Sequence, residues 1–124
     1  FYVDTLEFLR RGGRIGKASA WLGSALRVKP LLHVVDGDVA PLEKARTANR
    51  ALGRLADLAE EAAQGRRVQV AVQHLDAQDR AEGVAQRLRE HLRTDVLVCE
   101  VGAVMGVHVG PGLVAIAVSP AEVP

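Results

Sequence analysis

The length and composition of the chain are those of one globular domain: of its 124 residues, 48% are hydrophobic, 25% charged and 3% aromatic. Its formal net charge of +1 gives no general attraction to nucleic acid or to an anionic membrane surface. No apolar run reaches the roughly 18 residues that cross a bilayer. The single cysteine, Cys99, excludes an internal disulfide and favours a reduced, cytoplasmic setting with a buried, inert thiol.

Two short helices are predicted near the N-terminus. Asp4 and Glu7 have the spacing of a capping box and precede an apolar stretch, which predicts a helix that ends at Gly12 and Gly13. A second helix is expected over residues 17–26, because its small and apolar residues recur on one stripe before Pro30.

Strands and helices alternate in the rest of the chain. Asp36-Gly37 predicts a hairpin between two strands, Thr47 begins a strongly periodic helix, and Asp76 is expected to cap another. Three further strands are expected at 68–72, 95–101 and 113–118. Because the run from 67 to 101 reads strand–helix–strand, it favours a parallel crossover beside the hairpin. We therefore expect an α/β fold with a mixed, largely antiparallel sheet of about five strands covered by helices.

Common catalytic and metal-binding motifs are absent from the sequence. It contains no phosphate-binding loop, no Cys-x-x-Cys and no His-Glu-x-x-His, and its serines lack a nucleophile-elbow context. His33, His74 and His91 lack metal-ligand spacing and are expected at the surface or at strand ends. We expect no metal, no cofactor and no independent catalytic activity.

The stretch "VMGVHVGPGLVAIAV" places His108 directly before Gly-Pro-Gly and an apolar run. One interpretation is a tight turn that happens to include a histidine. The other is a ligand site, in which Gly110 and Gly112 let the backbone approach a head group that His108 also contacts.

The stretch "RRGGRIGKA" also has two interpretations. Arg14 and Lys17 either are solvated charges at a helix boundary or form an anion-binding corner at a helix N-terminus. Arg46, at the end of the predicted hairpin, is likewise either a solvated charge or a third basic contact for a partner.

Three ordered segments resemble the DegV family of bacterial fatty-acid-binding proteins. They are "YVDTLEFLRRGGRIGKASAWLGSALRVKPLL", "DGDVAPLEKART" and "EVGAVMGVHVGPGLVAIAV", and together they span nearly the whole chain. The resemblance implies that residues 1–124 form a single domain, the C-terminal half of a two-domain protein whose N-terminal domain is absent here. Val107 and Val109 depart from the family, which often has small hydroxyl residues at these positions.

The resemblance also implies a function. Family members hold a long-chain fatty acid in a tunnel, with the carboxylate contacted by hydroxyl groups of the N-terminal domain and by a histidine that matches His108, beside Gly110 and Gly112. They present the acid to a partner kinase for acyl-phosphate formation in phospholipid synthesis, and are not catalysts themselves. Residues matching Arg14, Lys17 and Arg46 are expected to dock that kinase.

Two other classes of function stay open at this point. A substrate-binding subunit of the dihydroxyacetone-kinase type shares the fold, and a plain scaffold domain binds no ligand. If the fatty-acid interpretation is right, the fragment alone should bind lipid poorly and should self-associate through an exposed apolar face.

Overall fold

The computed structural model describes residues 1–23 and 28–121, in which five strands form a mixed sheet in two parts. Strands β1 (Lys29–Val35) and β2 (Asp38–Ala45) form an antiparallel hairpin. The other part has the order β4-β3-β5, formed by β3 (Val68–His74), β4 (Val96–Glu100) and β5 (Val114–Pro120). Strand β3 runs parallel to β4 and antiparallel to β5. The predicted α/β class with a mixed, largely antiparallel sheet is confirmed.

Tyr2 connects the two parts of the sheet. It forms antiparallel bridges to Leu31 of β1 and to Val114 of β5, and its amide nitrogen lies 2.8 Å from the Val114 carbonyl oxygen. Its side chain is fully buried. Phe1 completes the link, because its backbone nitrogen and oxygen both bond to Leu32 of β1. The hairpin therefore joins the three-stranded part through two residues that the sequence patterns did not assign to a strand.

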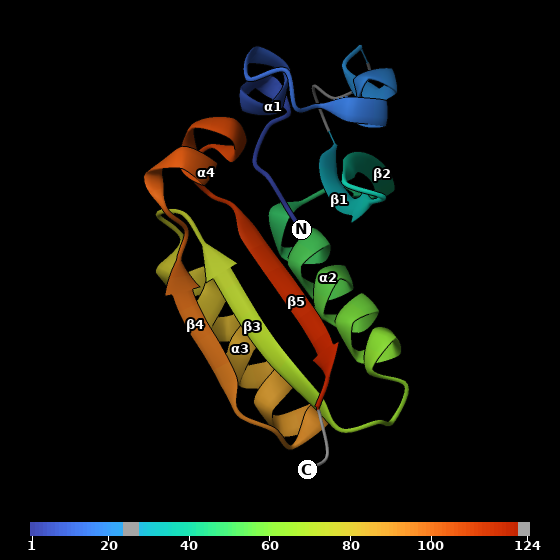
Figure 1. Cartoon of the computed structure of the whole chain (residues 1–124), viewed down its shortest axis with the longest axis vertical. Coiled ribbons are helices and arrows are strands. Elements are labelled where there is room, and N and C mark those ends of the chain that lie inside the picture. The colour runs from blue at the N-terminus through green and yellow to red at the C-terminus, as the bar shows by residue number, and fades with distance from the viewer. Residues whose placement is uncertain (24–27, 122–124) are drawn as a thin grey trace.

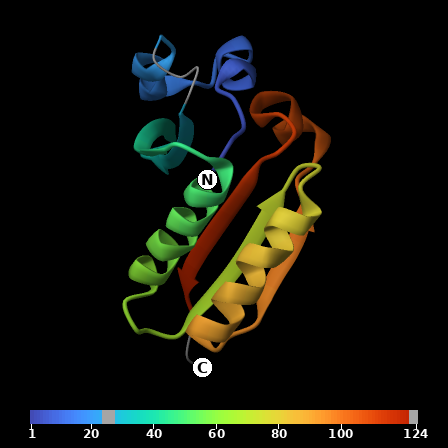
Figure 2. The ribbon, with the colours of Figure 1, turned by 180° about the vertical axis from the view of Figure 1, so that it is seen from behind.

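Two long helices cover one face of the three-stranded part, as the opposite views of Figures 1 and 2 show: α2 (Ala48–Ala63) and α3 (Gln78–Leu92). Alternate residues of β3, Val68, Val70 and Val72, are buried against the apolar stripes of these helices. Thr47 caps α2 as predicted, because its hydroxyl accepts a hydrogen bond from the Arg50 amide at 3.1 Å. This packing forms the larger of two hydrophobic cores.

A smaller core lies where the N-terminal segment meets the end of the chain. Helix α1 (Glu7–Arg11) and the 3-10 helix η1 (Gly16–Trp21) pack there with α4 (Ala103–Val109). Its buried residues are Val3, Leu6, Leu9, Ala18, Leu32, Val109 and Leu113. In Figure 1 these elements gather at the end of the molecule opposite the C-terminus.

Several predicted boundaries were wrong. Leu6, not Asp4, precedes α1, and Ala77, not Asp76, precedes α3. The amide of Ala77 donates instead to His74 Nδ1 at 3.2 Å. The second helix is the short η1, and the expected helical residues at 24–26 lie outside the described part of the chain.

Helix α4 was not predicted at all. Residues 103–109 form two hydrogen-bonded turns between β4 and β5, with the Gly110 amide donating to the Gly106 carbonyl at 2.9 Å. His108 therefore lies in the last turn of a helix and not in a loop that enters a strand. Cys99 differs from the expected buried thiol, because it is only half-buried. Within residues 1–23 and 28–121 no helix is long and apolar enough to cross a bilayer.

Candidate functional site

A cleft of about 850 Å³ lies beside α4. Its walls come from α4, β5, the β1–β2 hairpin and the ends of β3 and β4, and most of its lining residues are apolar. The polar lining residues are Arg14, His33, Gln73, Glu100 and His108. A cleft of this size with a few polar groups has the character of a small-molecule site.

His108 is the histidine whose environment needs an explanation. Its side chain lines the cleft, yet its Nδ1 atom is buried and has no hydrogen-bond partner among the described residues. Buried polar atoms in folded proteins nearly always have a partner, so an exception marks a candidate functional group. The cleft gives the rest of the imidazole access to a ligand.

Gly110 and Gly112 lie outside the lining of this cleft. Both have positive φ, +83° and +95°, where glycine is favoured. The Gly110 amide is bonded to Gly106, and the Gly112 amide donates to the Leu75 carbonyl at 2.8 Å. These two backbone donors are therefore already used within the chain, and the glycines contribute to the site through close packing.

The three basic residues singled out in the sequence are exposed. Arg14 lines the cleft, Lys17 lies in η1, and Arg46 follows β2, against which η1 packs. In the part of the chain that the structure describes, none of their side chains makes an ion pair or a hydrogen bond. Arg54 and Arg87, by contrast, are both paired with carboxylates. Arg14, Lys17 and Arg46 thus remain available to an external anion.

A polar cluster that links the N-terminal segment to α3 was missed by the sequence patterns. The Tyr2 hydroxyl donates to the Asp4 carboxylate, and Arg80 Nη1 lies 3.1 Å from Asp4 Oδ1. Burial opposes ionisation of Asp4, but the hydrogen bonds from Tyr2 and Arg80 outweigh it and lower the pKa of this carboxyl group. No local pattern could have found the pair, because Asp4 and Arg80 are 76 residues apart.

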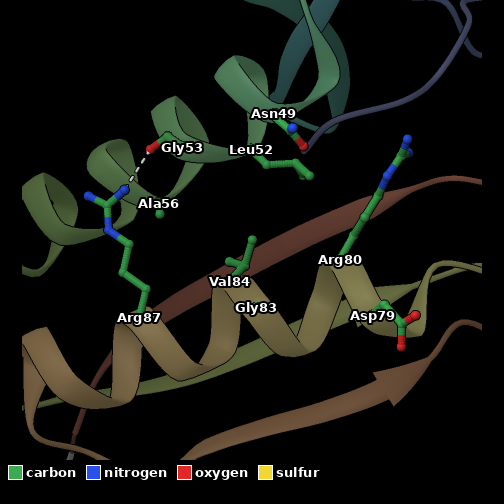
Figure 3. A pocket seen from close by; sticks show the side chains of 9 residues that line it. All are labelled: Asn49, Leu52, Gly53, Ala56, Asp79, Arg80, Gly83, Val84 and Arg87. Carbon is green, nitrogen blue, oxygen red and sulfur yellow. Dashed lines mark hydrogen bonds between the residues drawn. The ribbon is translucent and has the colours of Figure 1, made fainter.

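A second, smaller cavity between α2 and α3 is a weaker candidate. It has a volume of about 280 Å³ and is lined by the residues labelled in Figure 3. Arg87 Nη1 donates to the Gly53 carbonyl at 3.0 Å and also pairs with Asp57 and Glu60, while Arg80 pairs with Asp4. Because both arginines are already neutralised, this cavity offers no uncommitted cation. The described residues also contain no cluster of three or more potential metal ligands.

Comparison with known sequences gives the family of the chain. A profile of the family described as "Uncharacterised protein, DegV family" matches residues 1–121. A DegV domain-containing protein of Streptomyces coelicolor is 55% identical over 121 residues, which cover 96% of this chain and 43% of that protein.

Solved structures agree with the sequence comparison. The fatty acid binding DegV family protein of Streptococcus agalactiae matches with a TM-score of 0.89 and 35% identity, over 98% of this chain and 44% of that one. A DegV family protein of Thermus thermophilus, also described by its fatty acid binding, matches with a TM-score of 0.90 and 35% identity. The match covers 97% of this chain and 44% of that one. The chain spans less than half the length of these relatives. Since the family profile covers almost every residue, the chain belongs to the DegV family.

Proposed function

We propose that the intact protein containing this chain binds a long-chain fatty acid, with the acyl chain in the cleft beside α4 and the carboxylate at His108. The observation that carries the proposal is a largely apolar cleft with an unpaired histidine in its wall. The fatty acid binding described for the relatives from Streptococcus agalactiae and Thermus thermophilus supports it.

The chemistry of the cleft suits an amphipathic acid. Apolar walls such as Leu9, Val109 and Ile116 accept methylenes, each worth about 0.8 kcal/mol when buried. A carboxylate removed from water needs donors, and an imidazole N–H of His108 supplies one of them. Gly110 and Gly112 shape the chain immediately after His108, so they support the head-group site without donating to it.

The protein acts in this proposal as a carrier and not as a catalyst. A partner kinase transfers the terminal phosphoryl group of ATP to a carboxylate oxygen of the bound acid, giving an acyl phosphate and ADP. Arg14, Lys17 and Arg46 dock the kinase, because exposed, unpaired cations are suited to carboxylates on a partner. The acyl phosphate then enters phospholipid synthesis.

The test is native mass spectrometry of the full-length protein purified from cells. A co-purified long-chain fatty acid supports the proposal, whereas a small ketone adduct indicates a dihydroxyacetone-kinase-type subunit and an empty protein indicates a scaffold.

A matched pair of variants locates the ligand. Ala115 lines the cleft, whereas Ala117 lies on the same face of β5 outside it. Ala115→Trp fills the cleft and should remove the co-purified acid, while Ala117→Trp should retain it. Equal lipid content in the two variants would place the acyl chain elsewhere.

A further inference from the structure

The N-terminal segment and the segment from 108 to 112 pack against each other through paired positions, each with a glycine on one side. A Cβ atom on Gly112 would overlap the Asp4 carboxylate, and one on Gly110 would overlap the Phe8 ring. In the third pair the glycine changes sides: a Cβ atom on Gly12 would overlap Nδ1 of His108. The pairs run antiparallel along the two segments.

The backbone does not explain the glycine at position 12. Gly12 has φ −80° and ψ −1°, a right-handed conformation that any residue adopts. Its neighbour Gly13 has φ +68°, and a Cβ atom there would meet nothing within 4 Å. Gly13 is therefore required by the backbone, whereas Gly12 is required by the imidazole that lies against it.

This contact also orients the imidazole of His108. The Nδ1 and Cε1 atoms of the ring lie against Gly12, and the same residue lines the cleft. Nδ1 is buried and has no hydrogen-bond partner among the described residues, so packing against the Gly12 backbone, and not a hydrogen bond of Nδ1, holds this side of the ring.

We infer that Gly12 is a positioning residue for His108: the bare backbone at the C-terminal end of α1 leaves room for the imidazole and holds the ring in the wall of the cleft. The expected effect of Gly12 on ligand binding rests on the function proposed above, whereas the contact between Gly12 and the His108 ring does not. The double glycine after α1 consequently has two separate roles.

Thermal unfolding of the full-length protein tests the contact. Gly12→Ala should lower the melting temperature by about 4 °C or more, because overpacking displaces the ring. The control Gly83→Ala, inside α3 where a Cβ atom meets nothing within 4 Å, should not lower it. In a His108→Ala background the cost of Gly12→Ala should disappear. If Gly12→Ala is equally costly with and without the imidazole, the inference is overturned.

Two further measurements separate positioning from stability. Long-range ¹H–¹⁵N spectra of the histidine rings should show a different nitrogen pattern for His108 in Gly12→Ala than in the wild type; identical patterns contradict the inference. Stearate should bind Gly12→Ala and His108→Ala each about tenfold more weakly, with no further loss in the double variant. Additive losses contradict the inference. If the wild type does not bind stearate, the proposed function fails. Thermal unfolding and the spectra would still test whether Gly12 positions the His108 ring.

Discussion

At the scale of single residues, the site separates the head-group contact from the partner contacts. His108 has an unpaired buried nitrogen and lines the cleft, whereas Lys17 and Arg46 are exposed cations outside the cleft lining. Arg14 is exposed and also lines the cleft, but it is one of the polar lining residues, whereas the acyl chain is proposed to bind the apolar walls. Substitutions should therefore affect lipid content and phosphoryl transfer differently.

We predict that Arg14→Ala and Arg46→Ala leave the lipid content of the full-length protein unchanged but slow phosphoryl transfer by the partner kinase. His108→Ala should also lower transfer by altering how the carboxylate is held, while apolar burial keeps the lipid bound. Lipid mass spectrometry and steady-state phosphorylation measure the two effects. Loss of lipid in both arginine variants, with wild-type behaviour of His108→Ala, would show that the roles are assigned wrongly.

The Asp4 carboxylate makes stability depend on pH in a defined direction. Its pKa in the folded protein is lowered from 3.8. Burial raises this pKa, but the hydrogen bonds from Tyr2 and Arg80 lower it by more. The folded state thus favours the ionised form of Asp4. The stability that the Asp4 carboxylate contributes is present above pH 3.8 and is lost as the pH falls through the lowered pKa.

We therefore predict that Asp4→Asn lowers the melting temperature at neutral pH and that its difference from the wild type shrinks in acid. Glu7→Gln is a control, because Glu7 also has a lowered pKa but its carboxylate accepts from Arg10 and Arg11 of its own helix and not from Tyr2 or Arg80. A deficit for Asp4→Asn that is the same at neutral pH and well below pH 3.8 would argue against this linkage.

At the scale of elements, local patterns predicted those parts whose cause is local. The alternation of β3, the positive-φ turn at Asp36-Gly37 and the Thr47 cap were all readable from the sequence. The predicted cap at Asp4 failed because its carboxylate accepts from Tyr2 and from Arg80, which is 76 residues away in the sequence. The cleft could not be predicted, because its walls come from segments that meet only in the folded chain.

Helix α4 was missed because its residues do not favour a helix by themselves. Its seven residues include three valines and a glycine, which are poor helix formers. A helix this short is stabilised by its packing, here on α1 and the small core, and not by its own propensity. His108 lies in the last turn of this helix. The resemblance pointed to His108 as a candidate site residue but did not indicate that its backbone is helical.

We predict that Thr47→Ala destabilises the protein by about 1 kcal/mol, because the Arg50 amide loses its acceptor at the start of α2. Thr47→Ser should retain nearly all of the stability, since it keeps the hydroxyl. Urea unfolding compares the three proteins. An alanine variant as stable as the serine variant would mean that the cap contributes nothing.

At the scale of the whole molecule, an apolar face of α4 is exposed. Val104, Met105 and Val107 are 81%, 54% and 67% exposed. Val104 and Met105 also line the cleft, and exposed apolar patches of this kind are usually interaction surfaces. The relatives are more than twice as long as the chain, which leaves room for a further domain to cover this face.

We predict that residues 1–124 alone self-associate through α4 and bind stearate weakly. Light scattering after gel filtration should show a dimer that Val104→Glu dissociates. Leu97→Glu is the matched control, because Leu97 is 65% exposed on β4, away from α4. A monomer that binds stearate tightly would contradict both parts of the prediction.

The bridge formed by Tyr2 has a consequence for local unfolding. The β1–β2 hairpin and the β4-β3-β5 part are linked by a short backbone segment, in which Phe1 bonds to Leu32 on one side and Tyr2 bonds to Val114 on the other. Amide hydrogen exchange should therefore resolve two cooperative units that open separately, with Tyr2 at the boundary. Since the cleft takes its walls from both units, opening at Tyr2 would widen it without unfolding either one.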